Sequence, residues 1–299
     1  MTILVTGGAG FIGSNLVKDL LASGKDVVVM DNMQTGSMVN LQDLVGDLQV
    51  IRASCAEMGK FDLEPESIYH LGIPSSSPMY KRDPFLVGSA INDSIAVFEL
   101  AKKTGTKVVY ASSSSLYNGL QPPHREDMPI FVTDYYTEAR LTIERLAELY
   151  KKLFDVTSVG LRFFSVYGPK EEAKNQYANM ISQFLWTMKD GKSPVIYGDG
   201  SQTRDFVYVK DVVRALQLAM RSSYQGVLNI GTGIAYSFNE VITLLNLKMK
   251  TEIKPIYADN PIKNYVKETL ADTTKSQAMI GFKASYSLNE GIDELLKWL

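Results

Sequence analysis

Short apolar runs alternate with longer amphipathic segments through the first half of the chain. The apolar runs are rich in β-branched residues and predict strands over Ile3–Thr6, Val27–Asp31, Gln49–Arg52, Ser67–Leu71 and Lys107–Ser112. Segments with a helical spacing of apolar residues lie between them, such as Ile12–Ser23 and Ala90–Thr104. Strands that are apolar without strict alternation, and that alternate with helices, indicate a parallel sheet covered on both faces.

The pattern continues as far as Gly168-Pro169 and then changes. Before that point it predicts a long helix over Thr133–Phe154 and a further buried strand over Thr157–Phe164. Beyond it we expect a helix over Ala178–Lys189, a Gly-rich loop over Pro194–Arg204, and two short strands, Asp205–Val209 and Val227–Ile230, that could return to the first sheet. The second lobe is therefore expected to be discontinuous in sequence.

A glycine-rich motif, Gly7-Gly8-Ala9-Gly10-Phe11-Ile12-Gly13, follows the first predicted strand and opens the first predicted helix. The glycines at positions 7, 10 and 13 let the backbone approach a pyrophosphate, and the start of the helix offers unsatisfied N–H groups to that anion. A tight strand-to-helix turn would also use glycine, so the motif needs support from its surroundings.

That support comes from Asp31, which stands 18 residues past Gly13 at the end of the second predicted strand. A carboxylate there accepts hydrogen bonds from the hydroxyls of an adenosine ribose and repels a 2′-phosphate. The motif and the acid together predict a dinucleotide-binding site that takes NAD rather than NADP. The alternative is that Asp31 and Asn32 form a solvated turn.

A second set of polar residues comprises Ser113 and Ser115 after a strand, followed by Tyr136 and Arg140. Tyr136 and Arg140 are four residues apart in a helical pattern and project from one helix face. A tyrosine beside a fixed cation can act as an acid and base, because the cation stabilises phenolate over phenol. The alternative is an ordinary contact on a helix surface.

In combination these motifs resemble the extended short-chain dehydrogenases/reductases, in the branch of nucleotide-sugar epimerases and dehydratases that includes UDP-glucose 4-epimerase. The resemblance runs nearly end to end and is carried by Thr6–Ser14, Asp31-Asn32, His70-Leu71, Ser112–Tyr117, Tyr136-x-x-x-Arg140, Leu161–Pro169, Gly198–Val207 and Asn229–Gly233. It implies an α/β fold: a Rossmann-like doubly wound parallel sheet with a smaller C-terminal substrate lobe. We place the NAD-binding domain at 1–167 plus about 205–233, and the nucleotide-sugar lobe at about 168–204 and 234–299.

The resemblance also implies roles for individual residues. Ser113 would hydrogen-bond the reacting sugar oxygen, Tyr136 would move its proton, and Arg140 would orient the cofactor ribose; these three are the candidate catalytic residues. The implied cofactor-binding residues are Gly7, Gly10, Phe11, Ile12, Gly13, Asp31, Asn32, Leu71, Tyr136 and Arg140. The implied substrate-binding residues are Ser113, Ser115, Ser165, Asn179, Val195, Tyr197 and Arg204, with Arg204 and Asn179 on the diphosphate.

The chain departs from the family pattern at three places. Arg140 stands where the family has lysine, which keeps the positive charge but changes the directions of its donors. Ser54-Cys55 follows the third strand, where the family usually has an acid that contacts adenine. A second phosphate-binding arginine expected near Asp259–Lys263 is missing, and Lys263 is the available substitute.

Two segments are similar to ADP-glyceromanno-heptose 6-epimerases instead. They are Pro261-x-Lys263-x-Tyr265 with the following Thr269–Asp272, and Tyr167–Lys174. In that family Lys174 would match a second acid or base, whereas a mixed charge run of this kind is more often a solvated loop.

Composition narrows the classes of partner. The 299 residues include 31 Lys and Arg against 33 Asp and Glu, so the formal net charge is −2 and no basic block suggests nucleic acid or an anionic membrane. One cysteine, Cys55, and two histidines argue against a disulfide scaffold and against a metal site. With no signal-peptide pattern and no apolar run of about 20 residues, we expect a cytoplasmic protein.

The expected function is NAD-dependent epimerisation of a nucleotide-diphosphate sugar, most simply at C4 of a UDP-hexose, through a 4-keto intermediate. A dehydratase is less well supported, because Ser114-Ser115 provides no carboxylate to eliminate water. The alternatives are a heptose-type 6-epimerase and a non-catalytic protein that binds NAD or a nucleotide sugar. By resemblance we expect a homodimer that pairs through Ala90–Thr104 and Thr133–Phe154.

Overall fold

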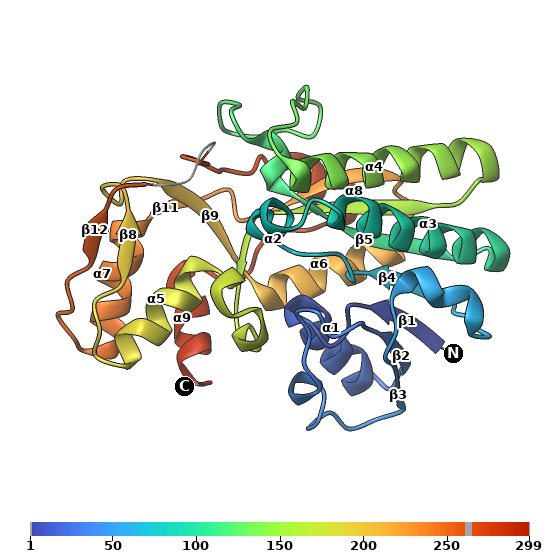
Figure 1. Ribbon diagram of the computed structural model, residues 1–299, viewed down its shortest axis with the longest axis horizontal. Coiled ribbons are helices and arrows are strands. Elements are labelled where there is room, and N and C mark those ends of the chain that lie inside the picture. Colours follow the sequence, from blue (N-terminus) through green and yellow to red (C-terminus); the bar gives the residue numbers. More distant parts are fainter. Residues whose placement is uncertain (1, 261–264, 299) are drawn as a thin grey trace.

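The computed structural model describes residues 2–260 and 265–298 (Figure 1). Its central sheet has seven parallel strands. The strand order is β10-β6-β5-β4-β1-β2-β3. The bounds are β1 Thr2–Thr6, β2 Asp26–Met30, β3 Leu48–Ile51, β4 Ser67–His70, β5 Lys107–Ser113, β6 Ser158–Phe163 and β10 Gly226–Ile230. The predicted parallel sheet is confirmed, and Val227–Ile230 does return to it.

Helices cover both faces of this sheet, as the apolar strand pattern predicts. Residues Ile3 and Val5 of β1 belong to one core, with α1 (Phe11–Ala22) and α6 (Val209–Arg221), whereas Leu4 belongs to the other. The second core contains α3 (Leu86–Thr104) and α4 (Tyr135–Phe154), with the short α2 (Ser77–Arg82) beside them. Side chains alternate between the two faces of a strand, so each strand contributes to both cores.

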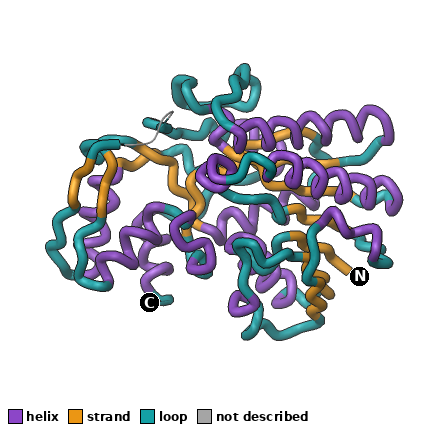
Figure 2. The backbone as a smooth tube through the Cα atoms, viewed as in Figure 1, coloured by secondary structure: helices purple, strands orange, loops and turns teal. Residues whose placement is uncertain are grey.

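A smaller lobe lies beside the carboxyl ends of the parallel strands, on the left in Figures 1 and 2. It contains a three-stranded sheet and a two-stranded sheet, in the orders β11-β9-β7 and β12-β8. The strands are β7 Ser165–Tyr167, β8 Val195–Tyr197, β9 Thr203–Tyr208, β11 Ala235–Ser237 and β12 Ile256–Ala258. The helices that pack on them are α5 Met180–Lys189, α7 Phe238–Met249 and α9 Leu288–Leu296, and α8 (Thr274–Ile280) packs near β10.

Two predictions for this region are wrong. Pro194–Arg204 is not only a loop, because it contains β8 and the first residues of β9. Asp205–Val209 contributes to β9, which pairs with β7 and β11 and not with the first sheet. Strands of three residues are too short to carry a period-two signal, and partner choice is a tertiary property that a local pattern does not contain.

Four short 3₁₀ helices complete the described elements: η1 Met38–Asn40, η2 Cys55–Lys60, η3 Ser114–Tyr117 and η4 Glu172–Tyr177. η2 follows β3 and packs against α3, whereas η3 follows β5 directly. Both 3₁₀ helices therefore begin at the edge of the sheet where the parallel strands end.

A buried ion pair fixes α4 against this sheet. The guanidinium of Arg162 on β6 donates from Nε and Nη2 to the carboxylate of Glu144 on α4, at 2.9 and 2.7 Å. Ser112 on β5 donates to the same carboxylate at 2.6 Å, and Arg162 also donates to the Tyr117 hydroxyl at 2.8 Å. Removing one partner would leave an uncompensated buried charge, so the network holds α4 in one register against β5 and β6.

Candidate active site

A cavity of about 620 Å³ opens at the carboxyl ends of the parallel strands. Its walls come from the segments that follow β1, β2, β3, β4, β5 and β6, together with residues of α3, α4 and the chain around η4. Ten residues predicted to bind the cofactor line it: Gly7, Gly10, Phe11, Ile12, Gly13, Asp31, Asn32, Leu71, Tyr136 and Arg140. Ligands of open α/β sheets bind at this edge.

The glycine-rich turn is shaped by close backbone approach. Gly7 has a φ of +68°, in the left-handed region that favours glycine, and its N–H donates to the carbonyl of Met30 at 2.8 Å. A Cβ at Gly13 would lie 2.1 Å from the carbonyl oxygen of Gly7, so no larger residue fits there. Gly10 is the N-cap of α1 and has no side chain to accept from the first turn. The turn therefore presents backbone N–H groups to an anion in the cavity.

Asp31 is buried, with 7% of its surface exposed, which contradicts the alternative of a solvated turn. Its carboxylate accepts the N–H groups of Ala9 at 3.0 Å and Met33 at 2.8 Å. Burial raises the pKa of this carboxyl, and the backbone donors oppose that shift. Asn32 forms the turn, because its side-chain oxygen accepts the N–H of Gln34 at 3.0 Å.

Tyr136 and Arg140 lie together in the cavity wall and do not form a surface contact. Arg140 is only 3% exposed, and its Cζ is 4.9 Å from the centroid of the Tyr136 ring. Its Nη2 donates to the carbonyl of Pro74 at 2.9 Å and its Nη1 to the carbonyl of Ala111 at 3.2 Å. A second tyrosine, Tyr80, packs edge-on against Tyr136 with 5.5 Å between ring centroids.

Ser113 ends β5 in the same wall, and Ser115 stands outside it. The Ser113 Oγ accepts the backbone N–H of Ser115 at 3.1 Å. The described lining of the cavity does not include Ser115. Its contribution is the backbone N–H that holds the Ser113 side chain. Ser165 lines the cavity from the start of β7.

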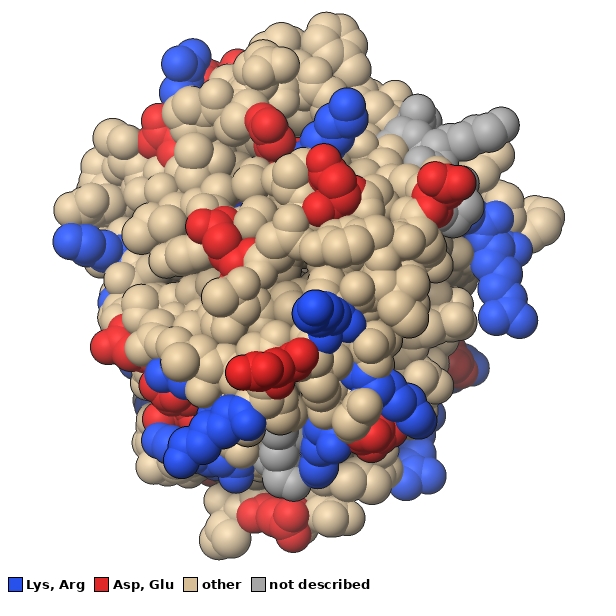
Figure 3. All heavy atoms as spheres, turned by 90° about the vertical axis from the view of Figure 1, so that its left-hand side faces the viewer, with Lys and Arg blue, Asp and Glu red and all other residues tan. Residues whose placement is uncertain are grey.

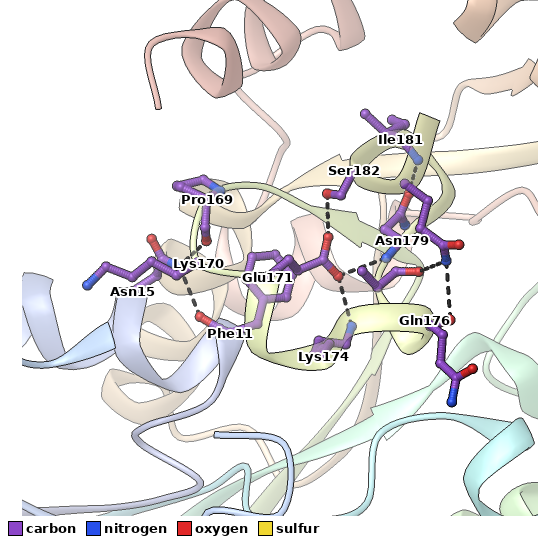
Figure 4. A network of polar contacts seen from close by, with 12 residues as sticks. Phe11, Asn15, Pro169, Lys170, Glu171, Lys174, Gln176, Asn179, Ile181 and Ser182 are labelled. Atoms are coloured by element: carbon purple, nitrogen blue, oxygen red, sulfur yellow. Dashed lines mark hydrogen bonds and ion pairs between the residues drawn. The ribbon is translucent and has the colours of Figure 1, made fainter. Parts of the chain in front are cut away.

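Asn179 lines the cavity where α5 begins, and a buried carboxylate organises the chain around it (Figure 4). The Asn179 side chain accepts the N–H of Ile181 at 3.0 Å, which makes it the N-cap of α5. Glu171 is fully buried and accepts from Lys174 Nζ at 2.8 Å, the Asn179 N–H at 2.9 Å and Ser182 Oγ at 2.6 Å. The charged end of the segment Tyr167–Lys174 is therefore held by buried contacts and is not a solvated loop.

Lys174 itself lines the cavity, and sequence reasoning did not include it among the site residues. Its Nζ lies 5.4 Å from the centroid of the Phe11 ring, beside the glycine-rich turn. The signal for it was present as the similarity of Tyr167–Lys174 to heptose epimerases, but only the fold shows that its partner Glu171 is buried.

Besides Ser115, three of the predicted substrate residues lie outside the described lining of the cavity, namely Arg204, Val195 and Tyr197. Arg204 donates to the backbone carbonyls of Thr203 at 2.8 Å, Val266 at 2.5 Å and Lys267 at 3.1 Å. Val195 and Tyr197 are 45% and 40% exposed on β8. Lys263 lies outside the described residues.

No candidate metal centre occurs in the described part of the chain. No group of three His, Cys, Asp or Glu side chains there could hold a metal ion. His70 is fully buried between the Thr6 and Ser94 hydroxyls, at 2.8 and 3.0 Å, and burial lowers its pKa to about 3.

None of the described helices combines the length and apolar character needed to cross a membrane. On the face in Figure 3, Lys and Arg are interspersed with Asp and Glu.

The cavity suits a dinucleotide for one further reason. The Nε of Arg140 and the Oγ of Ser75 are buried, both residues line the cavity, and neither atom has a hydrogen-bond partner within residues 2–260 and 265–298. Buried polar groups are nearly always hydrogen-bonded. The hydroxyls of a ribose would supply the missing partners next to Tyr136.

A parallel sheet, a glycine turn on a helix N-terminus, a buried acid at the end of β2, and a tyrosine beside a cation define a dinucleotide-binding α/β protein of the dehydrogenase type. The chain belongs to the NAD dependent epimerase/dehydratase family, whose sequence profile matches residues 3–231. The resemblance identified from the motifs is confirmed, and so is the prediction of NAD as cofactor.

Among curated relatives, UDP-glucose 4-epimerase of Mycolicibacterium smegmatis is 30% identical over 100% of this chain and 98% of its own length. UDP-glucuronic acid decarboxylase 1 of Arabidopsis thaliana is 31% identical over 99% of this chain and 69% of its own length. The chain is therefore similar to proteins named for two different reactions on UDP-sugars.

Solved structures share the fold over the whole chain. UDP-glucose 4-epimerase of Thermotoga maritima, solved with UDP-glucose, has a TM-score of 0.94 and 30% identity, covering 100% of this chain and 98% of its own. ADP-L-glycero-D-manno-heptose-6-epimerase of Helicobacter pylori has a TM-score of 0.88 and 28% identity, covering 99% and 95%.

Proposed function

We propose that this protein is an NAD-dependent nucleotide-sugar epimerase that interconverts the C4 epimers of a UDP-hexose, with Tyr136 as the acid and base. The observation that carries the proposal is the meeting of Ser113, Tyr136 and Arg140 in one wall of the cavity that also contains the glycine-rich turn and Asp31. The similarity to enzymes named as UDP-glucose 4-epimerases supports the substrate class.

In the proposed reaction Tyr136, as phenolate, takes the proton of the C4 hydroxyl, and Ser113 hydrogen-bonds the same oxygen. Arg140, whose Cζ lies 4.9 Å from the centroid of the Tyr136 ring, stabilises the phenolate electrostatically. Its Nε, which has no partner among the described residues, can donate a hydrogen bond to the cofactor ribose. The glycine-rich turn and Asp31 would hold NAD, which would supply a reversible acceptor for the hydride of C4. After the sugar has turned over in the cavity, C4 takes the hydride back on its opposite face, and Tyr136 returns the proton to the 4-keto oxygen.

The sugar can turn only while the rest of the molecule stays attached. Binding energy at the diphosphate, remote from C4, would provide that attachment. Asn179, at the N-terminus of α5, and Lys174 are the described polar residues of the cavity on the substrate side that suit this role. The Arg204 guanidinium donates hydrogen bonds to three backbone carbonyls. Its proposed contact with the diphosphate requires the guanidinium to give up those hydrogen bonds for new ones to the phosphate oxygens.

The lining of the cavity favours epimerisation over elimination of water. The carboxylates in the described lining are Asp31, at the end of β2, and Asp93, on α3. The segment Ser113–Ser115 contributes none. A dehydratase needs an acid and a base beside the sugar, and the segment that carries Ser113 supplies no carboxylate for that role.

The test is Tyr136→Phe assayed with UDP-glucose by product chromatography. We expect turnover to fall by at least a thousandfold while NAD stays bound, because the ring and its packing against Tyr80 are kept. Wild-type-like turnover in this variant would refute the assignment. UDP-glucuronate and ADP-heptose, assayed in parallel, separate a decarboxylase and a heptose-type 6-epimerase from the proposed reaction.

Two further outcomes address the remaining alternatives. Thermal stabilisation by nucleotide sugars without any product or oxidised sugar would favour a non-catalytic binding protein.

We also propose a homodimer that pairs through α3 and α4, since Leu149, Leu153 and Phe154 of α4 are 46–58% exposed. A light-scattering mass of one chain would refute that dimer.

A further inference from the structure

The cavity contains a second buried carboxylate, Asp93, that none of the steps above uses. It is on α3, is 6% exposed, and lines the cavity together with Ala53, Cys55 and Leu86. α3 packs against η2, which follows β3. The acid therefore lies where the end of β3 meets α3.

The two oxygens of this carboxylate have different surroundings. Oδ1 accepts the hydroxyl of Ser54 at 2.5 Å and the N–H of Ala56 at 2.7 Å. Oδ2 accepts no hydrogen bond from the described residues. A carboxylate has about four acceptor positions, so Oδ2 can still accept donors from a ligand in the cavity. Burial without a cation partner is costly for such a group, and a donor from the ligand would offset part of that cost.

The sheet order places this acid relative to the cofactor. The glycine turn after β1 takes the pyrophosphate, and Asp31 after β2 takes the adenosine ribose. β3 is the neighbour of β2 on the side away from β1. The group attached to that ribose, the adenine base, then lies between the end of β3 and α3. Ala53, Cys55 and Leu86 provide apolar contacts for a flat heterocycle there.

We propose that Asp93 recognises the exocyclic amino group of adenine, and that Ser54 positions its carboxylate. The inference rests on NAD as the cofactor and does not depend on which sugar is the substrate. It also accounts for Ser54 at the position where the family resemblance implies an acid: in this chain the acid comes from α3, 39 residues later. Adenine offers an N–H donor to Oδ2, whereas hypoxanthine offers a carbonyl oxygen that Oδ2 would repel.

The competing explanation is that Asp93 only caps η2. Ala56 is in the first turn of η2, so the same hydrogen bonds would be expected of a capping residue. Capping predicts a loss of stability on substitution, with no effect on which base is preferred. The choice between the two bases is therefore the discriminating measurement.

The experiment measures the affinities of cofactor-stripped protein for NAD and for nicotinamide hypoxanthine dinucleotide by calorimetry. The wild type should prefer NAD by about ten- to a hundredfold. In Asp93→Asn, the amide oxygen must keep accepting from Ser54 and Ala56, so the NH₂ takes the place of Oδ2. That group donates to the hypoxanthine oxygen, and the preference should disappear or reverse.

Two other variants complete the test. Ser54→Ala keeps the charge of Asp93 but removes the hydrogen bond from the Ser54 hydroxyl that orients its carboxylate. We expect the preference for NAD to fall about threefold while the protein stays folded. Glu57→Gln alters an exposed acid of η2 outside the cavity lining and should leave the ratio unchanged. A wild-type ratio in Asp93→Asn, or equal affinities in the wild type, would overturn the role of Asp93. Failure of the wild type to bind either dinucleotide would instead refute the NAD assignment itself.

Discussion

Arg140 provides the sharpest test of the proposed chemistry, because its charge and its hydrogen bonds can be removed separately. Arg140→Met keeps most of the side-chain volume but removes the charge. Arg140→Lys keeps the charge, and its single ammonium cannot reproduce the guanidinium bonds to both Pro74 and Ala111. The two variants therefore separate electrostatic from structural contributions.

The expected size of the effect follows from the distance of 4.9 Å between the guanidinium carbon and the Tyr136 ring centroid. At an effective dielectric constant of about 20, a unit charge at that distance stabilises the phenolate by about 3 kcal/mol. If that stabilisation is present in the transition state, its loss lowers kcat/KM by about a hundredfold. Arg140→Lys should lose less than about tenfold.

The assay compares kcat and KM for UDP-glucose with NAD content and melting temperature in the same samples. Arg140→Met also removes one hydrogen bond to the Ala111 carbonyl and one to the Pro74 carbonyl, which keeps the Tyr80 hydroxyl at 3.3 Å, so its melting temperature should fall. A variant that is folded, loaded with NAD and fully active without the charge would refute the electrostatic role. Greater loss of activity in Arg140→Lys than in Arg140→Met would refute it as well.

Three further changes test the fold and the cofactor site. Burial holds the pKa of His70 at about 3, below its ordinary 6.5, so the unfolded chain binds more protons and stability falls as the pH drops below 6.5. The loss reaches about 2 kcal/mol near pH 5, and His70→Gln should flatten that part of a denaturation series; an unchanged slope would contradict the assignment. Gly13→Ala should abolish NAD binding, because its Cβ would lie 2.1 Å from a backbone oxygen, whereas Gly88→Ala, with open space around it, should bind NAD normally. Arg162→Met should cost about 3–5 kcal/mol in urea denaturation by leaving its buried carboxylate partner unpaired, while Lys151→Met, at an exposed pair, should not change the midpoint.

Much of the fold could be predicted because its signals are local. The strands of the central sheet are continuous apolar runs, and each run needs only its own residues to be recognised. The end of α4 is an example of the same kind: Asp155 adopts a left-handed conformation as C-cap, where the amphipathic pattern stops. The strands β8 and β9 were misjudged because their pairing partners, β12, β7 and β11, are distant in sequence.

The candidate site divides in the same way. The glycine-rich turn and the pair Tyr136 and Arg140 are defined by spacings of a few residues on one element, so a motif is enough to find them. Whether Lys174 lies in the site or in a solvated loop was harder to predict, because its position depends on an ion pair with Glu171, which is buried only in the folded protein. Ser115 and Arg204 were assigned by resemblance, and the structure places both outside the described lining of the cavity.

The sequence by itself determined that the chain binds a dinucleotide on a parallel α/β sheet and carries a tyrosine beside a cation. These properties follow from turn geometry, strand composition and the helical repeat, which act over short stretches of chain. Only the tertiary structure decided which charged groups are buried together: Arg162 with Glu144, and Asp93 with Ser54. Burial and pairing arise when segments far apart in sequence pack against each other, and they set the energies on which the chemistry of the site depends.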